Sequence, residues 1–129
     1  MKRRWVAALV CALSAVFAAL AGVEVVEARK GAPDIPTVSV EDLPQGVRDT
    51  LALLKQGGPF PYKRDGVVFD NRERSLPSRP RGYYREYTVP TPGARDRGAR
   101  RIVSGGDPPV VYYYTDDHFR SFRQLEPRP

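Results

Sequence analysis

The spacing of hydrophobic residues follows three successive patterns along the chain. Trp5 to Val23 is an almost unbroken apolar run behind a short basic cluster, Lys2 to Arg4. Further on, Val47, Leu51 and Leu54 recur at helical spacing. From residue 67 onward, short apolar runs alternate with turns rich in proline and glycine. The three patterns predict a targeting segment, one amphipathic helix and a sheet, in that order.

The N-terminal run is typical of a secretory signal peptide. A basic region precedes it, and Val26-Glu27-Ala28 offers a cleavage site, with Leu20-Ala21-Gly22 as an earlier one. An uncleaved membrane anchor is the alternative, because the run approaches the length that a spanning helix needs. Abundant alanine, and the lack of a basic cluster directly after the run, favour the signal peptide. We therefore expect residues 1–28 to be removed and the protein to be secreted.

The predicted helix has clear limits. Pro44 suits a first helical turn, and Gly57-Gly58 is typical of a helix end. The helix of about three turns presents an apolar stripe that needs a sheet to cover it. Five later segments have the composition of strands: 67–69, 83–89, 99–105, 110–115 and 118–125.

These elements predict one α+β domain. Strands at short intervals favour an antiparallel meander, so we expect one N-terminal amphipathic helix packed on an antiparallel sheet of about four to five strands. The last strand would supply Phe119, Phe122 and Leu125 to the core. The folded domain is expected over 43–126. Residues 29–42 form a flexible lead-in that ends in a short strand at 37–40.

Cysteine content and net charge limit the disulfides, metal sites and partners that can be expected. Cys11 is the only cysteine and lies in the predicted signal peptide, so the exported chain cannot form a disulfide. A single histidine makes a zinc site unfavourable, and no metal or cofactor is expected. The net charge of +6 suits a polyanionic partner such as nucleic acid, an acidic polysaccharide or an anionic surface. Ordinary solubility is the alternative explanation for that charge.

One predicted hairpin concentrates charge. Its first strand carries one acid, Glu86. If the turn centres on Pro92-Gly93, Glu86 lies opposite Ala99 and shares its face with Arg97 and Arg101. A one-residue slip would reverse the faces. Other arginines of the same segment are Arg95 and Arg100.

This arrangement is suited to phosphate chemistry. Two guanidinium groups can hold a phosphate, and their charge keeps a neighbouring carboxylate ionised, as a general base must be. His118 is the one candidate for a general acid. Base, acid and phosphate clamp are what cleavage of RNA through its own 2′-hydroxyl requires. The alternative is a solvated lattice of ion pairs beside a surface histidine, which is common and weakly stabilising.

Three separated segments carry a more specific signal: PFPYKRDGVVFDNRE, GYYREYTVPTPGARDRGARRIV and YYYTDDHF. In order and spacing they resemble the small secreted microbial guanyl-specific ribonucleases related to barnase. The resemblance runs from about Leu43 to Leu125. It implies the microbial ribonuclease fold and an endoribonuclease that cleaves single-stranded RNA after guanosine, through a 2′,3′-cyclic phosphate to a 3′-phosphate.

The resemblance also implies residue roles. Glu86 matches the general base and His118 the general acid, while Arg97 and Arg101 match the arginines that stabilise the transition state. Tyr62 matches an aromatic residue at the rim of the phosphate site. Guanine would be bound by Phe69, Asp70, Asn71, Arg72, Glu73 and Phe119.

Within the guanine site, the Glu73 carboxylate can accept both donors of the base, and backbone N–H groups near Asn71 and Arg72 can meet its O6. Phe69 resembles the stacking partner. Two positions depart from the family pattern. Asp70 adds a charge where relatives often have a neutral residue, and Phe119 stands where relatives usually carry tyrosine.

Three interpretations follow. The first is a secreted, metal-independent, monomeric guanyl-preferring endoribonuclease, and the resemblance implies for it an acidic protein inhibitor similar to barstar. The second is a catalytically weak relative that binds RNA or another polyanion as a toxin-like module. The third is a structural domain with a solvated basic face. The joint presence of Glu86, Arg97, Arg101 and His118 favours the first.

Overall fold

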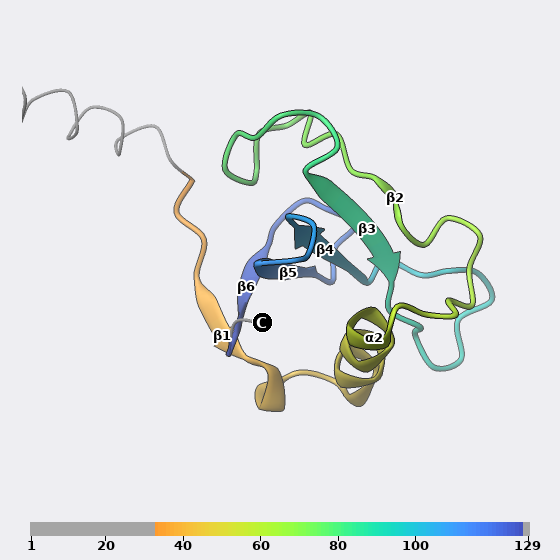
Figure 1. Ribbon diagram of the computed structural model, residues 1–129. Helices are drawn as coiled ribbons and strands as arrows, with labels where there is room; N and C mark the ends of the chain where they lie inside the picture. The colour runs from red at the N-terminus through yellow and green to blue at the C-terminus, as the bar shows by residue number, and fades with distance from the viewer. Residues whose placement is uncertain (1–32, 128–129) are drawn as a thin grey trace, which may run out of the picture. The chain divides into compact units, whose positions relative to one another are not determined.

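The computed structural model describes residues 33–127, so the predicted signal peptide and the start of the lead-in lie outside the described residues. One α-helix, one short 3-10 helix and a six-stranded sheet account for the regular structure of this part (Figure 1). In chain order the elements are β1 (Thr37–Ser39), the short 3-10 helix η1 (Val40–Asp42), α2 (Gln45–Gln56), β2 (Val67–Val68), β3 (Tyr84–Thr88), β4 (Arg101–Gly105), β5 (Val111–Thr115) and β6 (Arg123–Glu126).

The sheet has the order β1-β6-β5-β4-β3-β2. Strands β2 to β6 form the expected antiparallel meander. Strand β1 differs, because it pairs in parallel with β6 through Val38 and Leu125. The expected four to five strands therefore become six in a mixed sheet, and the end of the predicted lead-in is part of the folded domain.

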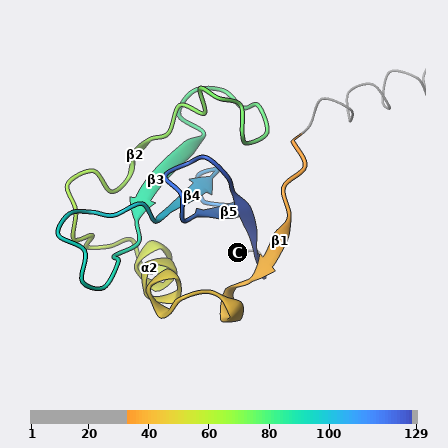
Figure 2. The same ribbon diagram turned by 180° about the vertical axis from the view of Figure 1, so that it is seen from behind.

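The helix α2 follows its sequence signals closely. Pro44 precedes it, and Gly57 ends it with a φ of 82°, a left-handed conformation that glycine adopts readily. Its buried residues Val47 and Leu51 pack with Ile102 and other side chains from one face of the sheet. Figures 1 and 2 show α2 beside that face from opposite sides. Within residues 33–127, no helix is long and apolar enough to cross a membrane.

The opposite face of the sheet combines a second apolar cluster with polar groups. The cluster contains Tyr84, Val103 and Tyr113. Further along the same face lie the buried polar residues Glu86, Thr88, Arg101 and Thr115. This polar part of the face is where the candidate site is built.

Two sequence-based predictions for this region are wrong. Glu86 pairs with Val103, not with Ala99, and Arg101 pairs with Thr88. The predicted and the observed partner of Glu86 are separated by an even number of residues, so Glu86 and Arg101 still share a face. The predicted strand 118–125 begins only at Arg123, because residues before it form a loop after β5.

Candidate active site

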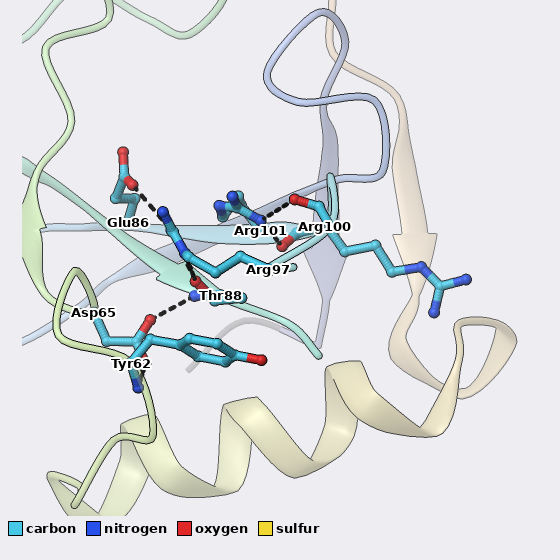
Figure 3. A network of polar contacts seen from close by, with 8 residues as sticks. Tyr62, Asp65, Glu86, Thr88, Arg97, Arg100 and Arg101 are labelled. Atoms are coloured by element: carbon cyan, nitrogen blue, oxygen red, sulfur yellow. Dashed lines mark hydrogen bonds and ion pairs between the residues drawn. The ribbon is translucent and has the colours of Figure 1, made fainter. Parts of the chain in front are cut away.

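Glu86 and Arg97 form an ion pair at the polar end of this face. Glu86 is 7% exposed, and its Oε1 lies 3.7 Å from Arg97 Nη2 (Figure 3). Arg97 does not belong to a strand; it lies in the loop between β3 and β4. Its Nε and Nη2 atoms donate to Thr88 Oγ1 at 3.1 and 2.9 Å. The loop thus folds Arg97 back over β3, beside the carboxylate.

Arg101 lies deeper than Arg97. It is 3% exposed, and its Nη1 donates to the carbonyl oxygens of Gly98 and Arg100 at 2.9 and 2.8 Å. Burial lowers the pKa of Arg101, and the neighbouring positive charge of Arg97 acts in the same direction, while Glu86 opposes it. Its buried Nε has no hydrogen-bond partner among the described residues. A buried guanidinium with spare donor capacity is suited to an anion.

Asp65 connects a preceding loop to this cluster. Its Oδ1 accepts from the Thr88 backbone N–H at 2.7 Å, and its Oδ2 accepts from that of Tyr62 at 3.1 Å. Figure 3 shows Tyr62 and Asp65 on the loop next to the end of β3. No sequence pattern indicated Asp65, although its bonds position the loop that carries Tyr62.

His118 approaches the cluster from the other side of β4. Thr88, Arg101 and Thr115 are in register across β3, β4 and β5, and His118 follows β5. The His118 backbone N–H donates to the Ala99 carbonyl oxygen at 3.1 Å, just before β4. Glu86 on β3 and the exposed His118 therefore lie on opposite sides of the strand that carries Arg101.

A pocket of about 430 Å³ adjoins His118. Every residue predicted to bind guanine lines it, together with His118 and two residues that the sequence analysis missed, Ser75 and Arg120. Glu86, Arg97, Arg101 and Tyr62 do not line this pocket. His118 thus lines the pocket and is also bonded, through its backbone N–H, to the segment just before β4. The complete lining is Phe69, Asp70, Asn71, Arg72, Glu73, Ser75, His118, Phe119 and Arg120.

The pocket wall is held by specific contacts. The Asn71 side chain donates to the Leu76 carbonyl at 2.9 Å and accepts from the Leu76 N–H at 3.0 Å, while Asn71 itself has a φ of 54°. These two bonds close the 71–76 loop, and the Arg74 backbone N–H closes it further by donating to the Asn71 carbonyl oxygen at 3.0 Å. The rings of Phe69 and Phe119 are 4.9 Å apart, so the two aromatic residues form a continuous apolar wall.

Asp70 is compensated electrostatically. Its carboxylate oxygens lie 3.1 Å from Arg81 Nη1 and 3.6 Å from Arg72 Nη2. The expected unfavourable charge beside a polyanion is therefore offset by two arginines. Across residues 33–127, no group of three or more His, Cys, Asp or Glu side chains is arranged to hold a metal ion.

Comparisons with known proteins identify relatives of this chain. The ribonuclease family model matches residues 27–126. The chain is 56% identical to guanyl-specific ribonuclease Sa3 of Kitasatospora aureofaciens over 65% of this chain and 59% of that protein. It is 54% identical to guanyl-specific ribonuclease St of Saccharopolyspora erythraea over 67% of this chain and 83% of that protein.

Solved structures of ribonucleases are also similar to this chain. The crystal structure of ribonuclease Sa2 with guanosine-2′-cyclophosphate is similar with a TM-score of 0.69 and 48% identity, over 74% of this chain and 100% of that one. The structure of ribonuclease Sa2 with mononucleotides has a TM-score of 0.70 at 48% identity, over 74% and 97% of the two chains. The match spans about three fifths of the length of ribonuclease Sa3.

Proposed function

The chain belongs to the ribonuclease family, and from this membership and the geometry of its site we propose that it is a guanyl-specific endoribonuclease. One observation carries the proposal. The pocket with the guanine-binding pattern contains His118, which lies across β4 from Glu86, with Arg101 between them. Recognition of a base and cleavage of the adjoining phosphodiester are therefore possible in one continuous region of the molecule.

In the first step, the Glu86 carboxylate takes the proton from the guanosine 2′-hydroxyl. The 2′-oxygen attacks phosphorus, and the bond to the 5′-oxygen of the next nucleoside breaks. His118, protonated, gives its proton to that oxygen. Placement on opposite sides of β4 suits this division of roles, since the attacking and departing oxygens lie on opposite sides of phosphorus.

Arg97 and Arg101 stabilise the charge that develops on the phosphoryl oxygens. Arg97 reaches the cluster from a loop, whereas Arg101 is fixed by its burial and by two backbone carbonyls. Donors that are already oriented require little rearrangement during the reaction, which is the main advantage of such a site. Tyr62, on the loop tied down by Asp65, borders the phosphate.

In the second step the two groups exchange roles. His118, now neutral, removes a proton from water, whose oxygen attacks phosphorus. The bond from phosphorus to the 2′-oxygen breaks, Glu86 returns its proton to that oxygen, and the cyclic phosphate opens to a 3′-phosphate. The ribonuclease Sa2 structures with guanosine-2′-cyclophosphate and with 3′-GMP contain nucleotides that correspond to such intermediates and products. No step of this mechanism requires a metal ion.

Guanine is recognised in the pocket. The exposed Glu73 carboxylate accepts from the N1–H and N2–H₂ groups of the base, and backbone N–H groups of the closed loop near Asn71 donate to O6. Phe69 and Phe119 offer ring faces for stacking.

We also propose that the protein is secreted as a monomer and that an acidic protein inhibitor similar to barstar covers its arginine-rich face inside the cell. The basic N-terminal cluster and the apolar run behind it support export. The charge of the Arg97 and Arg101 region supports an acidic partner.

Sequencing the products of a defined single-stranded RNA tests the proposed activity. Incubation with the purified protein in EDTA should give fragments that end in guanosine 2′,3′-cyclic phosphate at first and guanosine 3′-phosphate later. Cleavage without base preference, or cleavage that requires added metal, would contradict the proposal. RNA binding with no cleavage would identify the catalytically weak relative instead.

A further inference from the structure

The loop after β5 contains an uncommon backbone conformation. His118 and Phe119 have φ angles of 60° and 71°, two consecutive left-handed residues with full side chains. The left-handed region is unfavourable for residues with a Cβ atom, and such strain persists only where the surroundings enforce it. Both residues line the pocket. Contacts within this loop must therefore hold the backbone of His118 and Phe119 in the left-handed conformation.

Asp117 supplies the contacts that hold this loop. Its Oδ1 accepts from the Thr115 hydroxyl at 2.8 Å and from the Ser121 backbone N–H at 2.9 Å, and its Oδ2 accepts from the Ser121 hydroxyl at 2.5 Å. These bonds span the two left-handed residues from one side to the other. We call the three residues Thr115, Asp117 and Ser121 the loop clamp.

The loop clamp is anchored in the core at one end. Thr115 is 1% exposed and pairs with Arg101 across β5 and β4. The same Thr115 Oγ1 also accepts from the Phe119 backbone N–H at 3.1 Å. The carboxylate, the hydroxyl and the Phe119 N–H thus form one chain of hydrogen bonds that connects the buried strand with the strained segment.

The charge of Asp117 strengthens these bonds. Burial raises the pKa of Asp117, but hydrogen bonds from Ser121, from the Thr115 hydroxyl and from the Arg120 backbone outweigh burial and lower the pKa to about 2. Hydrogen bonds to an ionised acceptor are stronger than neutral ones. The Asp117 carboxylate therefore stays ionised, and the loop clamp intact, at neutral and moderately acidic pH.

We propose that Asp117 is a positioning residue that acts through its neighbours: it holds the left-handed segment that directs His118 to the departing 5′-oxygen and Phe119 to the base. This inference rests on the proposed function. It means that the rate of the reaction depends on Asp117, a side chain that contacts neither the substrate nor the reacting atoms.

A pair of alanine variants provides the first test. Asp117→Ala removes the loop clamp, and Asp116→Ala is its matched control, because it removes the same charge one residue away and loses only the ion pair of Asp116 with Arg123. With a guanosine-containing dinucleotide as substrate, Asp117→Ala should lower kcat by roughly 10- to 100-fold, since a displacement of about 1 Å can have such an effect. Asp116→Ala should keep the parental kcat.

A double variant separates positioning from stability. If Asp117 acts through His118, Asp117→Ala should reduce kcat little further in a His118→Gln background. Glutamine at position 118 transfers no proton, so a change in its orientation should have little further effect on kcat. Asp117→Asn, which retains one acceptor oxygen, should recover part of the kcat. All rates are measured at a temperature at which circular dichroism shows each variant folded.

The backbone itself provides a measurement that does not need activity. NMR should show positive φ angles for His118 and Phe119 in the parental protein and in Asp116→Ala, and their loss in Asp117→Ala. If a folded Asp117→Ala variant keeps both angles, or has the kcat of Asp116→Ala, the inference is wrong. If the parental protein itself cleaves no RNA, the proposed function fails, and the φ angles still decide whether Asp117 holds the segment.

Discussion

The two faces of the sheet are built on different principles. The face beside α2 is filled by apolar side chains such as Val47, Ile102 and Leu125, and it serves packing. The opposite face buries Glu86 and Arg101 beside its second apolar cluster, and loops with strained residues border it. Arg101 and Ile102 are consecutive, so one strand, β4, contributes to both.

This contrast shows how a small domain separates stability from chemistry. Burying charged groups is unfavourable unless partners compensate, and here each is held by a limited set of partners: Arg97 for Glu86, and two carbonyls for Arg101. The apolar face, together with the second apolar cluster, supplies the stability that such a site requires. Substitutions of the apolar face should therefore affect the free energy of unfolding, whereas substitutions of the charged residues on the opposite face should affect the rate.

The largest effect is expected on the polar side. Glu86→Gln and His118→Gln should each lower kcat by roughly 10²–10⁴-fold if the residues serve as base and acid. Steady-state kinetics with a guanosine-containing dinucleotide measures this change. Two folded variants that cleave at the parental rate would show that the polar face is not the catalytic one.

The apolar face should respond in the opposite way. Ile102→Ala should lower the free energy of unfolding by about 2–5 kcal/mol, because Ile102 is fully buried and the truncation leaves a cavity. Its kcat should stay parental well below the melting temperature. Urea unfolding and kinetics on the same sample check both values. A large loss of kcat in the folded variant would mean that the faces are not separable.

Base preference should change without loss of fold. Glu73→Ala removes the carboxylate from the exposed pocket wall, and discrimination for guanine should fall by about 1–3 kcal/mol, as for other bidentate contacts to a base. Competition between oligonucleotides that differ in one base measures the ratio of kcat/KM values. Ser75→Ala, which changes another pocket residue but removes no carboxylate, is the control. Unchanged selectivity in Glu73→Ala would contradict the proposed role.

The smallest expected effect concerns acid stability. The pKa of Asp117 is lowered from 3.8 to about 2 in the folded protein, so its contribution to stability is present above pH 3.8 and is lost as the pH falls through about 2. Asp117→Asn should therefore destabilise the protein at pH 6 and differ progressively less from the parent as the pH decreases toward 2. Urea titrations at several pH values check this trend, and a difference independent of pH would contradict it.

The sequence predicts best those elements that short-range signals define. The limits of α2 follow from Pro44 and Gly57, and the apolar stripe of the helix follows from its spacing. The strands β3 to β5 follow from β-branched and aromatic runs. The parallel pairing of β1 could not be predicted in this way, because three residues carry little pattern and their partner lies near the other end of the chain.

The register of the central hairpin needed information that the sequence does not contain locally. A tight turn at Pro92-Gly93 implied Glu86 opposite Ala99, whereas the connection is a long loop that returns Arg97 to the sheet. Likewise, Phe119 suggested a strand, but it packs against Phe69 from a loop.

Some site residues were not predicted, although the sequence around them contains part of the pattern that would indicate them. Asp117 follows Thr115 by two positions, a spacing at which side chains often bond to nearby backbone and replace regular structure. Asp65 precedes a glycine in a turn, but its bond to Thr88 joins distant parts of the chain. Ser75 and Arg120 reach the pocket only through the fold.

The dependence of kcat/KM on pH tests the central claim most directly. The parental protein should give a bell-shaped profile, because Glu86 must be ionised and His118 protonated for the first step. Glu86→Gln should remove the decline on the acidic side, and His118→Gln the decline on the alkaline side. If both limbs persist in both variants, Glu86 and His118 are not the base and acid of this ribonuclease.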